Sequence, residues 1–281
     1  MPEKIGILHP GEMGISVAVS AQNSGQDVFW VSEGRGQETR SRAQYHSLVD
    51  AHSLEELCRT CSVIISVCPP HAAQDVARQV MGHSFKGLYA DLNAISPQRT
   101  RNIGATMEEG GITFVDGGII GGPAWKPGTT WLYLSGRDAQ RVADCFPSGP
   151  LQTVVIGAEI GKASALKMCY AAYSKGTTAL LCAVLGASES LEVRGDLERQ
   201  WSRDESGFAE QAAQRARRVT AKAWRFAGEM DEIAETFRET GLPDGFHGAA
   251  AEIYRRMAGF KGLETAPTLS ETLAALLRDS G

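Results

Sequence analysis

The chain has 281 residues, of which 43% are hydrophobic, with 28 basic against 33 acidic side chains. This length and apolar content allow a large buried core and two domains, and the slight acidity argues against nucleic acid as a partner. No apolar run reaches the roughly 20 residues that a membrane span needs. The chain starts with a predicted strand rather than a signal peptide, so we expect a cytoplasmic protein with no membrane partner.

The six cysteines fall mostly in apolar helix or strand patterns, where a free thiol behaves as a small hydrophobic group. Cys58 and Cys61 match C-x-x-C, but no second pair follows at the spacing of a zinc site. We therefore expect no metal.

Residues 4–14 combine a short apolar run, a glycine turn and the start of a helix. This order is typical of the first βαβ unit of a dinucleotide-binding fold. Gly11 stands where the backbone must approach a pyrophosphate, and Gly14 where the first helix must pack closely on the first strand. The usual first glycine is His9 here. The turn predicts cofactor contacts from His9, Pro10, Gly11, Glu12 and Met13.

Apolar runs alternate with amphipathic stretches along the first half of the chain, at the spacing of repeated βα units. The pattern predicts an α/β fold, a Rossmann-type, doubly wound and mostly parallel sheet over residues 1–158. Such sheets bind ligands at the carboxyl ends of their strands. The predicted strands are 5–8, 28–31, 63–67, 88–92, 113–115, 130–134 and 153–155, with helices over 72–81 and 97–109.

The end of the second predicted strand indicates which cofactor binds. An NAD site normally places an acidic residue here to hold the adenosine ribose, but Ser32 occupies the strand end. Ser32 can bind a 2′-phosphate, and Arg35 offers a planar fork that suits phosphate oxygens. This favours NADP. NAD stays open as the alternative, because Glu33 could hold the ribose instead.

Two later strand ends carry further candidates. Cys68, Pro69 and Pro70 form a stiff loop, which suits a wall over the cofactor. Asn93 lies just before a helix start made by Ser96 and a following proline. Its amide can donate and accept, so we expect it to contact the cofactor carboxamide or the substrate.

The second half, residues 159–281, is predicted to be an all-helical domain, opening with a long helix over 161–193. Lys167, Tyr170 and Ser174 share one face of that helix, which predicts a polar cleft, although a helical lysine commonly extends to water. The basic run 211–222 is predicted to be a solvated helix face. Further predicted helices cover 207–226, 230–240, 249–257 and 270–278, and His247 is a candidate substrate contact or a packing residue.

Together, the glycine turn, the strand end Asp91–Pro97, the segment Asp116–Gly122 and the segment Gly161–Lys167 resemble the β-hydroxyacid dehydrogenase and 6-phosphogluconate dehydrogenase superfamily. The chain looks like its poorly characterised bacterial branch, often labelled phosphogluconate-dehydrogenase-like. The resemblance implies hydride transfer with NAD(P) and homodimers. It also implies that Lys167 is the general acid and base, and that the paired glycines Gly121 and Gly122 contact the substrate.

Two positions depart from the family pattern. Ile120 replaces the serine that binds the substrate carboxylate, and Tyr170 replaces an asparagine. We therefore expect a small-molecule substrate that is larger or more apolar than a simple 3-hydroxyacid. Besides a dehydrogenase, an imine reductase and a catalytically silent NADP-binding redox sensor remain as alternatives, and Lys167 argues against the imine reductase.

Overall fold

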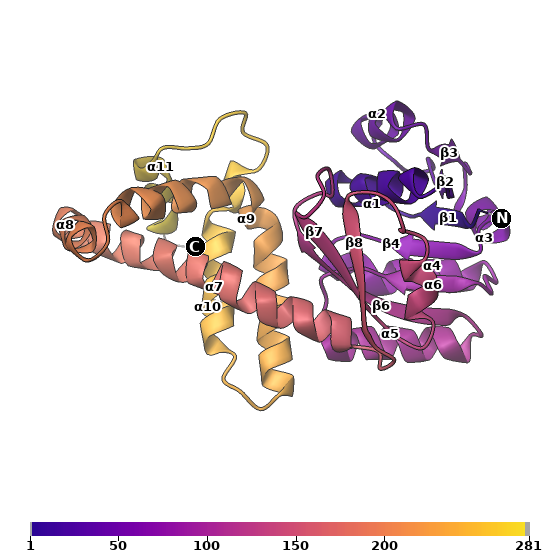
Figure 1. Ribbon diagram of the computed structural model, residues 1–281. Helices are drawn as coiled ribbons and strands as arrows, with labels where there is room; N and C mark the ends of the chain where they lie inside the picture. The colour runs from indigo at the N-terminus through magenta and orange to yellow at the C-terminus, as the bar shows by residue number, and fades with distance from the viewer. Residues whose placement is uncertain (1, 279–281) are drawn as a thin grey trace. The chain divides into compact units, whose positions relative to one another are not determined.

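The computed structural model describes residues 2–278 and is shown in Figure 1. The chain forms two compact units, one up to Met168 and one from Cys169 onward. The first unit holds the sheet, and the second is built from helices. The predicted fold class, a Rossmann-type α/β unit followed by a helical unit, is confirmed.

The first unit contains one eight-stranded sheet in the order β3-β2-β1-β4-β5-β6-β7-β8. All neighbouring strands are parallel except β6 and β7, which run antiparallel. The first strand is central, with the chain winding outward to both sides, which is the doubly wound order of a Rossmann fold. The strands are β1 (Lys4–Ile7), β2 (Asp27–Trp30), β3 (Val49–Asp50), β4 (Val63–Ser66), β5 (Leu88–Asp91), β6 (Thr113–Gly121), β7 (Thr130–Ser135) and β8 (Leu151–Gly157).

Helices cover both faces of the sheet, because successive strand residues point to opposite sides. On β5, for example, Leu88 and Ala90 belong to one core cluster and Tyr89 to the other. The first face is covered by α1 (Glu12–Asn23), α2 (Gln37–Tyr45) and α6 (Ala139–Ala143). The second is covered by α3 (Leu54–Thr60), α4 (Ala73–Gly82), which follows the 3₁₀ turn η1 (Pro70–Ala72), and α5 (Pro97–Glu109).

One strand is much longer than the sequence predicted. We expected a strand to end at Val115, yet β6 continues to Gly121. Gly117 and Gly118 lie beyond the predicted end of the strand, but they pair with Leu134 and Tyr133 of β7. Two glycines are tolerated inside a strand where other groups approach the backbone closely. The short strand β3 was not predicted at all.

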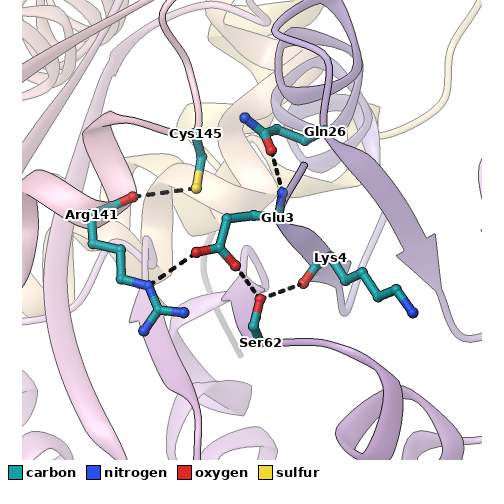
Figure 2. A network of polar contacts seen from close by, with 6 residues as sticks. All are labelled: Glu3, Lys4, Gln26, Ser62, Arg141 and Cys145. Atoms are coloured by element: carbon teal, nitrogen blue, oxygen red, sulfur yellow. Dashed lines mark hydrogen bonds and ion pairs between the residues drawn. The ribbon is translucent and has the colours of Figure 1, made fainter. Parts of the chain in front are cut away.

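The amino ends of the strands are tied together by the polar network in Figure 2. Glu3 accepts hydrogen bonds from the Ser62 hydroxyl and from Arg141 Nε at 3.2 Å, and its own N–H donates to Gln26 Oε1 at 2.7 Å. The Ser62 hydrogen bond, together with Arg141, lowers the pKa of Glu3. This network joins β1 to the starts of β2 and β4 and to α6, at the edge opposite the strand ends where ligands bind.

The helical unit contains the later turns of α7 (Lys162–Ser190), followed by four further α-helices within the described residues. α9 is one helix of 32 residues, whereas the sequence predicted two with a break near Gly228. The Met230 and Ile233 side chains are fully buried, so packing outweighs the local cost of that glycine. The helices after α7 are α8 (Arg194–Asp204), α9 (Phe208–Glu239), α10 (Gly245–Arg256) and α11 (Leu269–Leu276), with the 3₁₀ turn η2 (Ala258–Phe260).

Polar contacts hold α7, α9 and α10 together inside this unit. Tyr254 of α10 donates to the Lys175 carbonyl of α7 at 2.8 Å, and Lys175 forms an ion pair with Glu229 of α9. Glu229 is only 6% exposed, so its charge depends on this pairing. Among residues 2–278, no helix is both long and apolar enough to span a bilayer.

Candidate cofactor and active site

The N-terminus of α1 lies at the carboxyl end of the central strand β1 and has free backbone donors. Its N-cap residue, Gly11, makes no side-chain capping bond. A side chain added at Gly11 would meet nothing within 4 Å, whereas one added at Gly14 would lie 2.1 Å from the His9 carbonyl oxygen. Gly14 therefore lets α1 pack against the turn, and Gly11 leaves room for a ligand. A helix N-terminus with open space before it suits a phosphate group.

Arg35 and His9 add polar atoms that lack partners beside this turn. Among the described residues, the buried Arg35 Nε and the buried His9 Nδ1 have no hydrogen-bond partner. Burial, with a further contribution from the positive charge of Arg35, lowers the pKa of His9 to about 4. His9 is thus neutral at pH 7. Unpaired buried donors are costly, and a bound anion would satisfy the guanidinium.

Ser32 is held by a carboxylate that the sequence analysis did not single out. Asp50, at the end of β3, accepts hydrogen bonds from the backbone N–H groups of Ser32 at 3.2 Å and His52 at 2.8 Å. Burial would raise the pKa of Asp50, but hydrogen bonds from Ser32 and His52 outweigh it and lower the pKa. Asp50 is therefore ionised at neutral pH and places a negative charge beside Ser32, so Arg35 is the group that favours a 2′-phosphate.

Asn93 joins the ends of β4 and β5. Its Oδ1 accepts from the Cys68 N–H at 2.6 Å, and its Nδ2 donates to Ser66 Oγ at 3.1 Å. Its own N–H donates to Asp91 Oδ1 at 2.9 Å. Asn93 is 2% exposed, and these bonds fix the Cys68 loop to the strand end. Its predicted contact with cofactor or substrate stays a prediction and would use the second N–H of the amide.

Asp91 is a buried carboxyl in this network, and its Oδ2 has no hydrogen-bond partner among the described residues. Burial raises the pKa of Asp91 to about 7, despite the Asn93 N–H bond, and the charge of Asp116 contributes in the same direction. Burial, together with Asp91, also raises the pKa of Cys68 to about 12. The thiol is thus protonated and unreactive at neutral pH, as suits a wall residue.

The start of α7 is anchored to β6 by the carboxylate of Asp116. Its Oδ2 accepts from the N–H groups of Gly161, Ala163 and Ser164 at 2.9, 3.0 and 3.1 Å, and from the Ser135 hydroxyl at 2.9 Å. Its Oδ1 accepts from the Ser164 hydroxyl at 2.6 Å. Asp116 is fully buried. An anion with these donors satisfies the free N–H groups at the helix start.

The same region of β6 sets the position of Lys167. A side chain at Gly118 would lie 2.7 Å from the Ala163 carbonyl oxygen and 3.1 Å from Lys167 Cβ. The Lys167 backbone therefore lies directly over Gly118. A side chain added at Gly121 would clash with the Thr129 carbonyl oxygen, whereas one added at Gly122 would meet nothing within 4 Å. Of the paired glycines, Gly122 has room for a substrate beside it.

The remaining candidates lie in the helical unit. Tyr170 is 56% exposed, and its carbonyl accepts from the Ser174 hydroxyl at 3.1 Å. His247 is buried between Phe237 and Phe246, next to Gly176 of α7, and burial lowers its pKa. These surroundings favour the packing role of His247. The roles of Tyr170, Ser174 and His247 toward a substrate stay predictions.

No cluster of three or more metal-binding side chains occurs in the part of the chain that the structure describes. The residues at the carboxyl edge instead fit a dinucleotide, because Gly11 leaves space before the open start of α1 and Arg35 has an unpaired buried donor. Fold and site thus define a Rossmann-type nucleotide-binding protein. More particularly, residues 4–147 match the family described as the NAD binding domain of 6-phosphogluconate dehydrogenase, and the chain belongs to this family.

Residues 189–257 match a second family, a domain of unknown function called DUF1932. A curated relative, an uncharacterized 28.5 kDa protein from Methanothermus fervidus, is 28% identical over 69% of this chain and 74% of its own length.

Two solved structures are similar along almost the whole chain. A conserved protein of unknown function, described as similar to 3-hydroxyacid dehydrogenases, is 27% identical with a TM-score of 0.68, covering 98% of this chain and all of its own. The 3-hydroxyisobutyrate dehydrogenase of Mycobacterium tuberculosis shares the fold at 18% identity, with a TM-score of 0.71, covering 99% and 100%.

Sequence analysis missed Asp50 and gave Asp116 no role of its own. Asp50 is the last residue of a strand of only two residues, which is too short to leave a periodic signal. Asp116 could have been noticed because it precedes the two glycines of β6, yet its backbone N–H partners at the start of α7 lie 45 to 48 residues away in the chain. Only the fold brings them together.

Proposed function

We propose that this protein is an NAD(P)-dependent oxidoreductase that interconverts a hydroxyl and a carbonyl group of a small-molecule substrate. The observation that carries the proposal is the position of Lys167 over Gly118, on a helix start that Asp116 holds to the Rossmann sheet. A primary amine carried by a helix start that is fixed to such a sheet suits proton transfer.

In the proposed cofactor site, the N-terminus of α1 and Gly11 hold the pyrophosphate, and Arg35 holds the 2′-phosphate of NADP. When bound, the nicotinamide donates or accepts the hydride. The Cys68 loop, fixed by Asn93, bounds this site. NADP is preferred on account of Arg35, with NAD as the alternative because Asp50 places negative charge beside Ser32.

In the direction of oxidation, Lys167 accepts the proton of the substrate hydroxyl as the hydride leaves carbon; in reduction it returns that proton to the carbonyl oxygen. Asp116 does not touch the substrate in this scheme. It positions the helix from which Lys167 extends. Ile120, which is half-buried, offers no hydrogen bond to a carboxylate, so the substrate is larger or more apolar than a simple 3-hydroxyacid.

The test is an NADPH and NADH oxidation screen against ketones, 3-oxoacids and cyclic imines. Lys167→Met keeps the aliphatic stem and should lower turnover of the best substrate roughly a hundred- to ten-thousand-fold, the usual contribution of a positioned acid or base. Lys162→Met, on the exposed start of the same helix, is the matched control and should keep full turnover.

The outcomes separate the alternatives. Turnover of cyclic imines alone would identify an imine reductase. Tight cofactor binding without turnover of any compound would identify a redox sensor. Wild-type turnover by Lys167→Met would show that the proton travels by another route and would refute the proposed mechanism.

A further inference from the structure

The helical unit contains a cationic groove that the proposed function does not use. The groove has a volume of about 480 Å³ and lies between α9 and α7. Thr178 of α7 lines it together with residues of α9, namely Gln211, Gln214, Arg215, Arg218, Val219, Lys222 and Phe226. None of the residues lining it is acidic, although the chain as a whole has a net charge of −5.

The side chains of the basic run are divided between two directions. Residues 211, 215, 218 and 222 are spaced by four, three and four positions, which places them on one face of α9. Arg217 instead donates to the Pro267 carbonyl at 2.8 Å. The sequence predicted one solvated face for the whole run, and the structure gathers three of its cations into one groove.

The Arg215 side chain is fixed by hydrogen bonds to the neighbouring helix α7. Its Nε donates to Thr178 Oγ1 at 2.7 Å, and its Nη2 donates to the Ser174 carbonyl at 3.0 Å and to Thr177 Oγ1 at 2.7 Å. All three acceptors lie on α7 and are neutral. The guanidinium is therefore fixed without losing its charge to a carboxylate, which lowers the entropy cost of binding an anion.

Six arginines among the described residues of the helical unit form ion pairs with acidic side chains, whereas the three cations of the groove do not. Within residues 2–278, Arg215, Arg218 and Lys222 form no ion pair. Three unpaired like charges on adjacent turns repel one another, so an anionic ligand would stabilise the groove. The paired arginines of this unit are Arg194, Arg199, Arg225, Arg238, Arg255 and Arg256.

We propose that this groove binds a small organic polyanion, either a phosphate ester or a polycarboxylate. Arg218 offers a planar fork for carboxylate or phosphate oxygens, Arg215 offers its two Nη1 hydrogens, which the bonds to α7 do not use, and Lys222 adds a third charge. The two glutamines supply neutral donors, and Phe226 provides an apolar surface for the carbon skeleton of the ligand. The volume suits a molecule of metabolite size.

The experiment is isothermal titration of the full chain with pyrophosphate and with citrate at constant ionic strength, in the presence of saturating NADP. The NADP occupies the proposed cofactor site, which would otherwise bind pyrophosphate as well. We expect saturable binding of at least one probe, and the stronger of the two distinguishes phosphate from carboxylate ligands. Arg218→Ala with Lys222→Ala should weaken it about tenfold or more.

Arg137→Ala with Arg203→Ala is the matched control, because it removes the same charge from exposed positions outside the groove. It should bind the probes as the wild type does. Cofactor affinity, titrated separately, should be equal in all three proteins, so the result stands apart from the proposed dehydrogenase activity.

Three results would overturn the proposal. They are no binding of either probe at millimolar concentration, wild-type affinity in the groove variant, or binding of a long polyanion such as heparin alone. The last would indicate a macromolecular partner instead. Circular dichroism of each variant checks that its helices are intact.

Discussion

The Asp116 carboxylate accepts a hydrogen bond from the Ser164 hydroxyl at 2.6 Å. This bond joins the middle of strand β6 to the first turn of helix α7. Ser164 also lies 2.9 Å from the Thr100 hydroxyl of α5, so a strand and two helices meet at this point. The contact is buried and charged, and charge-assisted hydrogen bonds are about twice as strong as neutral ones. Because this contact fixes the first turn of α7 to β6, the sheet determines where the backbone of Lys167 lies.

Asp116→Asn should destabilise the protein by about 2–4 kcal/mol, because an amide replaces one acceptor oxygen by a donor and leaves buried N–H groups unpaired. Urea unfolding measures the loss. Ser135→Ala removes one donor to Asp116 and one of the two acceptors of the Ala163 N–H, which keeps Asp116 as its partner, and should cost about 1 kcal/mol. An Asp116→Asn variant that unfolds at the wild-type urea midpoint would show that the carboxylate does not anchor α7.

Gly118→Ala should lower turnover roughly ten- to a hundredfold, because its methyl group would push the Ala163–Lys167 turn of α7 away from β6. Cofactor affinity should not change. Gly82→Ala, where a side chain meets nothing within 4 Å, is the control. Steady-state kinetics and cofactor titration check both variants, and unchanged turnover in Gly118→Ala would contradict the assigned position of Lys167.

Arg35→Ala should weaken NADP about ten- to a hundredfold and NAD very little, as expected for one lost charge-assisted hydrogen bond to the 2′-phosphate. Arg78→Ala, on the exposed side of α4, removes the same charge and should change neither affinity. Fluorescence titration with both cofactors measures the ratio. Equal losses of affinity for NADP and NAD would show that Arg35 binds a part of the molecule that the two cofactors share, not the 2′-phosphate.

Asp91 should make the protein less stable as the pH rises. Its pKa is about 7 in the folded protein against an ordinary value of 3.8, so the folded state holds a proton that the unfolded state has released. This contribution is present below about pH 4 and is lost between about pH 4 and pH 7.

Asp91→Asn keeps the acceptor for the Asn93 N–H and removes the ionisation. Relative to wild type, its stability should increase as the pH rises from about 4 to about 7, by about 4 kcal/mol at most. Urea unfolding at several pH values measures the difference. A difference that does not change with pH would show that Asp91 ionises normally in the folded protein.

We propose that the protein forms a homodimer through α7. Tyr173, Leu180 and Leu191 of this helix region are 77%, 50% and 70% exposed, and such apolar exposure at helical spacing is typical of a contact surface. Light scattering should give a dimer, and Tyr173→Glu with Leu180→Glu should give a monomer. A wild-type monomer at micromolar concentration would exclude this surface as a stable interface.

Much of the fold followed from the sequence because its signals are local. The apolar runs around Ile5, Val63 and Leu88 predicted the strands, and the Ser96 cap followed by Pro97 predicted the start of α5 at the observed residue. The glycine turn at residues 11–14 predicted the start of α1, and the need for glycine at Gly14 is a property of the turn itself, because a side chain there would meet the His9 carbonyl oxygen.

Other features could not be predicted from local patterns. Gly117 and Gly118 look like strand breakers in sequence, yet they lie inside β6 because Leu92 and Ala163 occupy the space of their side chains. The unbroken helix α9 likewise depends on burial by neighbouring helices, which outweighs the propensity of Gly228.

The sequence by itself determined the class of protein: the alternating pattern, the glycine turn and the lysine-bearing helix all depend on residues within a few turns of one another. The tertiary structure decided which charges are paired. Asp50 holds Ser32, Asp116 holds the start of α7, and Arg215 is fixed by neutral acceptors while its neighbours stay unpaired. Electrostatic partners act through space, over separations of 18 to 48 residues in the chain, and no local pattern records them.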